Sequence, residues 1–306
     1  ERKQASKQIT SHRVDAMARY RSHAHRPFLL LLALLPLCSA VPWADFVAEE
    51  CGGQRAVSCD VVIPTGTSVE LDGDLNAEAA SVTVSGGTLT WEGTEPSVLS
   101  AGFVVAESGG TIQIGQSAAA PAPAGSGVFL RNNGESHARL GKRVLGATGP
   151  GASLRVFGEP LARTWMLLTE TAREGDQQLT LNTDVAAAGW KVGDRIAVAP
   201  TRAFPPQVAI GGSLSEAESF TIQSIAGNVV TLDGPLRQAR VGRADQRIQA
   251  EVINLSRTVT ISGDDYDRSD HGLHTIIANG ATGEMSYTRF EKGGQRGVLG
   301  KYPLHF

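Results

Sequence analysis

The chain has 306 residues, of which 41% are hydrophobic and 19% charged, with a formal net charge of −3. This content is enough for a folded core, because a chain of about 300 residues can bury roughly three-quarters of its unfolded surface. Glycine is unusually frequent, with 35 residues against a usual share of about 7%. The basic surplus lies in residues 1–26 and leaves an acidic remainder. Nucleic acid is therefore not an expected partner.

Residues 17–40 have the layout of a secretory signal peptide. A basic stretch precedes the apolar run 28–37, which is shorter than the about twenty residues that a bilayer requires. Small residues then precede Val41, so we expect cleavage before Val41 and a leader or non-native stretch at 1–16. We expect a secreted protein, or the extracellular part of a longer membrane protein, with no stable membrane span in this chain.

Export would leave two cysteines, Cys51 and Cys59. An exported chain with one such pair favours a disulfide that closes a small N-terminal loop. Two thiols are the alternative. A zinc site is disfavoured, because no His or Cys follows at ligand spacing.

Short alternating runs separated by glycine fill the chain from Asp60 onward, and no twelve-residue window has a convincing helical period. The glycine pairs 86–87 and 109–110 mark turns in which φ can be positive. The sequence therefore predicts an all-β protein. The runs that we expect to be strands include 61–63, 68–71, 81–85, 88–91, 103–105, 111–114, 153–157, 178–181, 195–199, 220–225 and 228–232.

After Ala250 the strands are spaced by Gly and Asn, which suits the rungs of a parallel β-helix. The chain reaches Phe306 without a polar cap, which a solenoid needs at its ends. We expect this to be the front part of a longer protein.

Several segments, in order, resemble the G-eight (eight-glycine) domain, a β-rich extracellular module. It occurs in the cell-migration-inducing hyaluronan-binding protein, transmembrane protein 2 and polyductin. The resemblance covers about residues 45–306 and is carried by 62–72, 81–89, 109–115, 189–196, 251–257 and 294–306. It implies an eight-glycine domain at 45–160, which runs into the start of a right-handed parallel β-helix at 161–306.

The sequence departs from the hyaluronan-cleaving members of this family at three places. No lectin-like insert follows Trp165, Arg240 stands where relatives carry His, and Thr258 replaces an Asn. Arginine cannot accept a proton at neutral pH. We therefore do not expect this chain alone to be catalytic, although whether it is an enzyme stays open.

A polar cluster at 264–274 holds four Asp and two His. Its carboxylates could bind a calcium ion, or an Asp and His pair could act on a glycosidic bond. A solvated loop between rungs is the structural alternative. The candidate catalytic residues are Asp270, His271, His274 and His305. No metal site or cofactor is assigned.

Tyr302 and His305 are the candidate ligand-binding residues, because an outward His and Tyr could line a sugar-binding groove. The alternative is a His packed at a corner. We expect Trp91, Trp165 and Trp190 to be core residues, and Asp194 to be a turn residue.

Asn254 begins the one Asn-x-Ser/Thr glycosylation motif of the exported part, and its modification requires an exposed side chain.

Two functions stay open. The first is an extracellular carbohydrate-associated module that binds a polysaccharide, a glycosaminoglycan or a cell-surface glycan, or presents a neighbouring domain. The second is a polysaccharide-degrading enzyme, similar to a hyaluronidase or a lyase, with its site on the β-helix.

Overall fold

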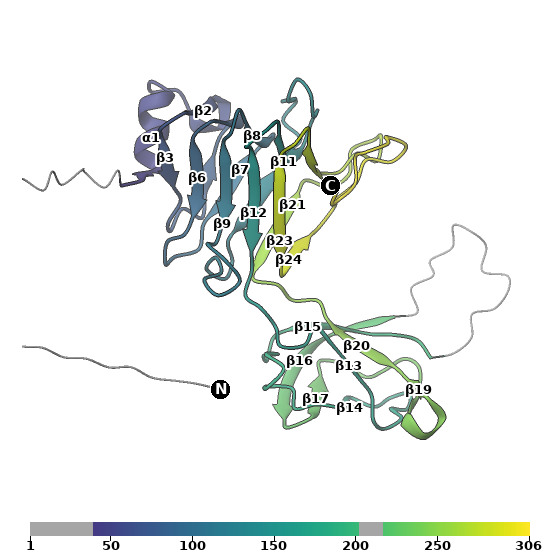
Figure 1. The fold of residues 1–306 in the computed structure, drawn as a ribbon. Helices are drawn as coiled ribbons and strands as arrows, with labels where there is room; N and C mark the ends of the chain where they lie inside the picture. The colour runs from purple at the N-terminus through teal and green to yellow at the C-terminus, as the bar shows by residue number, and fades with distance from the viewer. Residues whose placement is uncertain (1–38, 202–216) are drawn as a thin grey trace, which may run out of the picture. The chain divides into compact units, whose positions relative to one another are not determined.

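Figure 1 shows a computed structural model of the protein, which describes residues 39–201 and 217–306. The expected leader and nearly all of the expected signal peptide lie outside these residues and stay predictions. Within the described residues, no helix has the length and apolar character needed to cross a membrane. These residues are all-β apart from one short α-helix and two 3₁₀ turns, at Ala56–Ser58 and Ala244–Gln246, so the predicted all-β class is confirmed.

Three parallel sheets of six, five and five strands form one part of the molecule, which is built from strands at both ends of the described chain. The first sheet has the order β1 (Val41–Pro42), β3 (Ser68–Glu70), β6 (Thr88–Trp91), β9 (Thr111–Ile114), β12 (Ser153–Phe157) and β23 (Thr282–Ser286). The second has the order β24 (Thr288–Phe290), β21 (Val259–Gly263), β10 (Gly127–Leu130), β7 (Val98–Ala101) and β4 (Ala77–Glu78). The third has the order β2 (Asp60–Pro64), β5 (Ser81–Ser85), β8 (Val104–Glu107), β11 (Val144–Thr148) and β22 (His274–Ala278).

The chain visits these sheets in a fixed cycle. It passes from the third sheet to the first and then to the second in the triplets β2–β3–β4, β5–β6–β7 and β8–β9–β10, and enters a fourth cycle with β11 and β12. The next strand of the second sheet is β21, and β22, β23 and β24 continue the cycle. Each strand therefore pairs with its counterpart one cycle earlier or later (Figure 1).

Alternation along each strand places apolar side chains inside these sheets. In the first sheet the register aligns Val69, Leu89, Ile112 and Leu154, all fully buried. The neighbouring positions form an outward column of hydroxyl side chains: Ser68, Thr88, Thr111, Ser153 and Thr282. Because side chains alternate with a period of two, one face of each strand supplies the core and the other faces outward.

The predicted glycine turns have a specific steric cause. Gly109 has φ +83°, which favours glycine, and a Cβ on Gly110 would lie 2.0 Å from the Val84 carbonyl oxygen of the preceding cycle. Only glycine lets the chain turn this close to the cycle beside it.

Helix α1 (Trp43–Glu50) packs against the first strands with Trp43 and Val47 buried. It ends at Cys51, which forms a disulfide with Cys59 at a Cα–Cα distance of 5.8 Å. The predicted disulfide is confirmed. The helix has eight residues, so a search for twelve-residue helical periodicity could not find it.

A six-stranded antiparallel sheet is inserted between β12 and β21. Its order is β13 (Trp165–Leu167), β20 (Glu251–Asn254), β15 (Arg195–Val198), β16 (Glu218–Ala226), β17 (Val229–Leu232) and β14 (Gln178–Thr180). Backbone hydrogen bonds from Asn182 to Leu167 and from Thr169 to Thr180 join its two edges. The sheet thus closes around its own apolar core, and we call it the antiparallel barrel. A hairpin of β18 (Gly242–Arg243) and β19 (Ile248–Gln249) belongs to the same segment.

The parallel strands thus begin earlier than the sequence suggested. They start at β1 and β2, within the residues expected to form the eight-glycine domain, and antiparallel strands occupy much of the range 161–306 that was expected to be parallel.

Candidate functional site

Two loops of the parallel region meet at a pocket near the C-terminal end. One loop, residues 264–273, joins β21 to β22, and we call it the acidic loop. The other follows β24 and runs from Glu291 to Phe306. They enclose a cavity of about 730 Å³, named here the C-terminal pocket, which is lined by Tyr266, Asp270, Gly293, Gly294, Gln295, Arg296, Gly297, Val298, Leu299, Lys301 and Tyr302.

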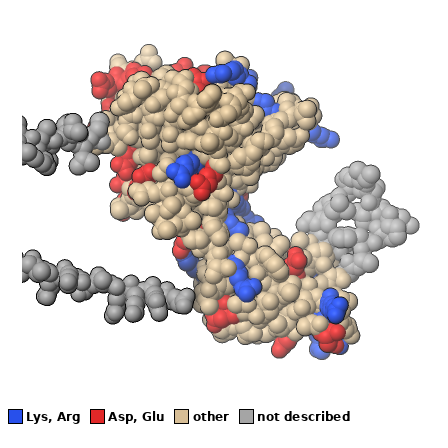
Figure 2. Space-filling model, viewed as in Figure 1, with Lys and Arg blue, Asp and Glu red and all other residues tan. Residues whose placement is uncertain are grey.

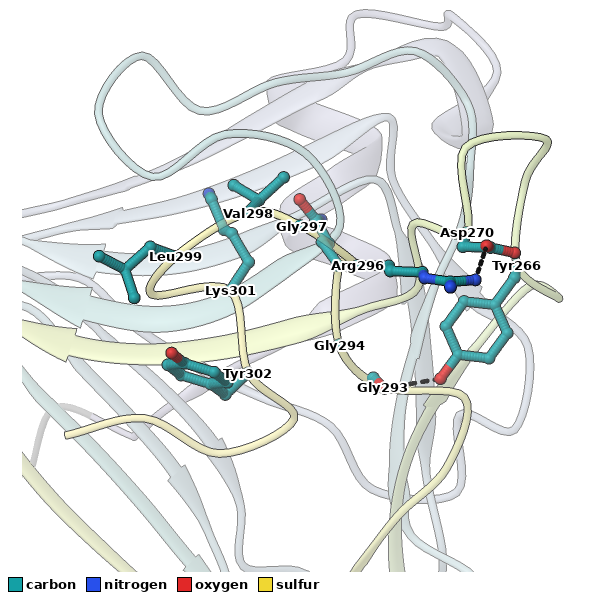
Figure 3. A pocket seen from close by; sticks show the side chains of 11 residues that line it. Tyr266, Asp270, Gly293, Gly294, Arg296, Gly297, Val298, Leu299, Lys301 and Tyr302 are labelled. Atoms are coloured by element: carbon teal, nitrogen blue, oxygen red, sulfur yellow. Dashed lines mark hydrogen bonds and ion pairs between the residues drawn. The ribbon is translucent and has the colours of Figure 1, made fainter. Parts of the chain in front are cut away.

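Contacts between the two loops hold one side of the pocket together (Figure 3). The Tyr266 hydroxyl donates to the Gly293 carbonyl oxygen at 2.7 Å. The Arg296 guanidinium lies 3.1 Å from the Asp270 carboxylate, and both side chains are largely exposed. The predicted candidate Asp270 therefore lines a pocket, but it does so as the partner of an arginine.

Asp267 shapes the turn of the acidic loop. Its Oδ1 accepts hydrogen bonds from the backbone N–H groups of Ser269, at 2.9 Å, and His271, at 3.1 Å. The backbone hydrogen bond from His271 is the main cause that lowers the pKa of Asp267, with the Ser269 hydroxyl next. This carboxylate therefore stabilises the local backbone.

Buried Arg143 anchors the acidic loop to β11. Its guanidinium donates to the carbonyl oxygens of Asp264, of Asp265 at 3.4 Å and of His271 at 2.6 Å. The side chain is 2% exposed, and its backbone has φ +54°. One buried cation thus fixes both ends of the loop that carries Tyr266 and Asp270.

His274 lies on β22 with its ring fully buried behind the pocket. Its Nε2 is 3.1 Å from the Leu140 carbonyl oxygen, and its Nδ1 is 3.3 Å from Gln295 Nε2. Burial, followed by the positive charge of Lys301, lowers the pKa of His274 to about 3. The catalytic role predicted for His274 stays a prediction; at this position the ring is fully buried and hydrogen-bonded at both nitrogens.

The other two histidine candidates lie at different places. His271 makes an isolated β-bridge with Gln295, which joins the two loops through the backbone. His305 Nδ1 lies 2.8 Å from the Gly300 carbonyl oxygen, and its ring packs edge-on against Tyr302 with centroids 5.2 Å apart. The predicted pair of Tyr302 and His305 is thus brought together, with Tyr302 45% exposed at the pocket.

Lys301 is a pocket residue that the sequence analysis missed. Its amine donates to the Leu140 carbonyl oxygen and lies 3.0 Å from His274 Nε2. Burial lowers its pKa. Arg296 and Gln295 were missed as well: they lie in the segment 294–306 that carries the family resemblance, but they were not among the candidate site residues. One sequence signal could have indicated these pocket residues. Four of the eight residues from 293 to 300 are glycines, which is typical of a loop with tight turns.

Asn254, the candidate glycosylation residue, is fully buried on β20 and so lacks the exposed side chain that modification requires. Its Nδ2 donates to Asp194 Oδ2 at 2.7 Å, and its Oδ1 accepts from the Ser256 N–H at 2.8 Å. A glycan on Nδ2 would displace this contact and could not fit inside the barrel. Asp194 also accepts from the Lys191 N–H at 2.9 Å, the turn role that the sequence predicted.

The three tryptophans expected in the core separate into two groups. Trp91 and Trp190 are 1% and 2% exposed, as predicted. Trp165 is 51% exposed, which corrects the expectation for this residue. It lies on β13, where period-two alternation turns the neighbouring Met166 inward instead.

Among residues 39–201 and 217–306, no three or more His, Cys, Asp or Glu side chains are grouped so that they could hold a metal ion. The carboxylates of the acidic loop are used in other ways: Asp265 pairs with Lys292 at 2.9 Å, and Asp270 pairs with Arg296. The pocket is lined by aromatic rings, cationic side chains and backbone polar groups. Such groups are typical of sites that bind a polar ligand.

Comparison with known proteins identifies the first part of the chain. Residues 55–169 match the G8 domain family, so the expected eight-glycine domain is confirmed. A G8 domain-containing protein of Dictyostelium discoideum is 30% identical over 161 residues, which are 52% of this chain and 13% of that protein. Communication mutant protein F of the same organism is 26% identical over 164 residues, which are 52% of this chain and 14% of that protein.

A vertebrate relative matches a longer part of the chain. Mouse fibrocystin-L is 26% identical over 274 residues, which are 73% of this chain and 6% of that protein. The matched regions thus span 6% to 14% of the lengths of these relatives.

Proposed function

We propose that this chain, which carries a G8 domain at residues 55–169, is an extracellular carbohydrate-associated β module. Its C-terminal pocket would bind a polysaccharide or a cell-surface glycan. The observation that carries this proposal is the convergence of Tyr266, Tyr302, Asp270, Arg296 and Lys301 on one cavity of about 730 Å³. Ligand pockets of this size typically combine apolar and aromatic walls with a few polar groups that orient the ligand.

The two tyrosines supply the apolar surface for a sugar ring. Tyr266 and Tyr302 are 49% and 45% exposed, and each is held from one side, by Gly293 and by His305 respectively. A fixed, half-exposed aromatic ring presents a flat face together with a polar end. Arg296, Lys301 and Asp270 supply donors and acceptors for hydroxyl groups beside those faces.

We further propose that the three parallel sheets are the faces of a right-handed parallel β-helix, in which each strand triplet such as β2–β3–β4 forms one rung. The fixed cycle of the chain through the sheets and the stacked inner columns support this. In a solenoid each repeat buries its apolar face on its neighbours, as Val69, Leu89 and Ile112 do here.

Secretion is part of the same proposal. The Cys51–Cys59 disulfide supports it, since structural disulfides persist in oxidising compartments. The signal peptide predicted at 17–40 is consistent with it.

The geometry favours binding over cleavage of a glycosidic bond. Hydrolysis of such a bond generally uses two carboxyl groups that face each other across the substrate. Asp270 is the one carboxylate among the residues that line the C-terminal pocket, and it is paired with Arg296. The nearby His274 is neutral and hydrogen-bonded, so it offers no second acid or base.

A glycan array probed with the purified protein tests the proposal. We expect a restricted set of glycans to bind, and Tyr302→Ala to reduce their signal. Trp165→Ala is the matched control, because it removes an exposed aromatic ring of the antiparallel barrel. Equal signals from the two variants, or no binding by the unmodified protein, would contradict a glycan site in this pocket.

A further inference from the structure

We propose that Lys301 is a reactive amine which forms a Schiff base with small aldehydes, including the open-chain reducing end of a sugar. This inference goes beyond glycan binding and does not depend on it. It begins from the contrast between Lys301 and two other described lysines, Lys191 and Lys292. Lys191 pairs with Glu159 and Lys292 pairs with Asp265, each at 2.9 Å. Among the described residues, no carboxylate lies within ion-pair distance of Lys301.

The immediate partners of the Lys301 amine carry no negative charge. They are the Leu140 carbonyl oxygen and the His274 ring. Gln295 fixes the protonation of that ring, because its Nε2 also lies 3.2 Å from the carbonyl oxygens of Lys142 and Gly272 and must therefore be the donor nitrogen. His274 Nδ1 then accepts, and Nε2–H donates to Leu140. The neighbour of the amine is thus a neutral imidazole.

The other charged groups near Lys301 balance each other. On the acidic loop and the C-terminal loop, Asp270 and Arg296 form an ion pair. His305 packs on Tyr302, next to Lys301 in the chain. Nothing in this set stabilises an ammonium ion strongly, and the half-buried site weakens its hydration, which favours the neutral amine.

Lys301 also lines the C-terminal pocket (Figure 3), and we expect a small aldehyde to reach its amine from there. In the reaction, the lone pair of neutral Nζ attacks the carbonyl carbon, and the C=O π bond breaks as the N–C bond forms. A proton passes from nitrogen to oxygen to give a carbinolamine. Loss of water then gives the imine, so amine and aldehyde are converted to imine and water with no change in oxidation state.

Incubation of the purified protein with glycolaldehyde and sodium cyanoborohydride tests this. The borohydride reduces the imine to a stable secondary amine, and peptide mass spectrometry measures adducts at Lys142, Lys191, Lys292 and Lys301 in one sample. We expect Lys301 to be modified several-fold faster than Lys191 and Lys292 at neutral pH, with a rate that rises at lower pH than theirs. Modification of Lys301 at the same rate as Lys191 and Lys292, or more slowly than they are modified, would overturn the proposal.

Two variants sharpen the result. Lys301→Arg should remove the dominant adduct while leaving a long hydrogen-bond donor at this position. The glycan array then shows separately whether this variant still binds glycans. His274→Glu places a carboxylate beside the amine and should reduce the preference for Lys301. Should this variant not fold, the pH profiles of the four lysines in the unmodified protein still decide the question.

Discussion

Single buried side chains position the loops of the C-terminal pocket. Arg143 satisfies three carbonyl oxygens of the acidic loop, and His274 holds Gln295 of the C-terminal loop through Nδ1. Both residues come from the third parallel sheet or the turn that precedes it. The third parallel sheet and its preceding turn thus orient residues that line the pocket.

His274 gives this arrangement a dependence on pH. Its folded pKa of about 3 lies below the ordinary value of about 6.5, so the unfolded chain binds the proton first. The free energy of unfolding should therefore fall as the pH falls below about 6.5, by up to about 1.4 kcal/mol per pH unit.

Denaturant titrations between pH 7 and pH 5 measure this slope, above the range in which the acidic side chains titrate. Replacement by an uncharged residue, His274→Gln, should flatten it. Equal slopes for the two proteins would show that His274 does not have the depressed pKa.

The sequence predicted some pocket residues and missed others for a physical reason. Asp270 was predicted because it lies in a short segment rich in Asp and His. Tyr302 and His305 were predicted because they lie together in a segment that resembles the family. Lys301 and Gln295 acquire their roles only from Leu140 and His274, which lie well away in the chain or on another element. No local pattern can report such contacts.

At the level of elements, the antiparallel barrel contains a buried ion pair. Glu218 on β16 and Arg240 are 3% and 1% exposed, and Arg240 Nη2 lies 2.8 Å from Glu218 Oε1. Arg237 contacts the other oxygen of Glu218 at 3.2 Å. Arg240 stands where the hyaluronan-cleaving relatives carry His. In this chain its guanidinium forms a buried ion pair inside the barrel.

Removal of this arginine should destabilise the barrel. Arg240→Ala would leave Glu218 buried without its main partner, which costs about 3–5 kcal/mol when one member of a buried pair is removed. Thermal unfolding measures the loss. The control is Arg243→Ala, which removes an exposed arginine paired with Asp245 and should leave the midpoint nearly unchanged. Similar midpoints for both variants would contradict a structural role for the buried pair.

Strand positions were largely predictable, but sheet membership was not. Alternation and glycine turns located β3, β5, β6, β9 and β12 within a residue or so. The same period-two pattern describes parallel and antiparallel strands, so it could not reveal that residues 165–201 and 217–254 form a separate antiparallel barrel. The wrong expectation for Trp165 has the same cause. Which face of β13 is buried depends on the strands that surround it, and the local sequence does not specify them.

At the scale of the whole molecule, binding of a long polyanion would require basic side chains that gather on one surface. On the face drawn in Figure 2, basic side chains lie singly or beside acidic ones. The arginines near residue 240, which could have formed a basic patch, are paired: Arg237 and Arg240 with Glu218, and Arg243 with Asp245. The pairing reduces the positive field that would attract such a polymer.

We therefore expect this chain to leave long hyaluronan intact. The pocket offers one carboxylate, and the buried imidazole of His274 is hydrogen-bonded at both nitrogens. The measurement is the polymer length after incubation with the purified protein, with and without calcium. Shortening that disappears in His271→Ala or His274→Ala would instead favour the degrading enzyme.

The most direct measurement of the central claim is a calorimetric titration of the strongest glycan from the array. The unmodified protein and Trp165→Ala should bind with equal affinity. Tyr302→Ala should bind roughly three- to tenfold more weakly, since an aromatic contact contributes about 0.5–1.5 kcal/mol and 1.4 kcal/mol is a factor of ten. Unchanged affinity in Tyr302→Ala, with loss in Trp165→Ala, would place the glycan on the antiparallel barrel and contradict binding in the C-terminal pocket.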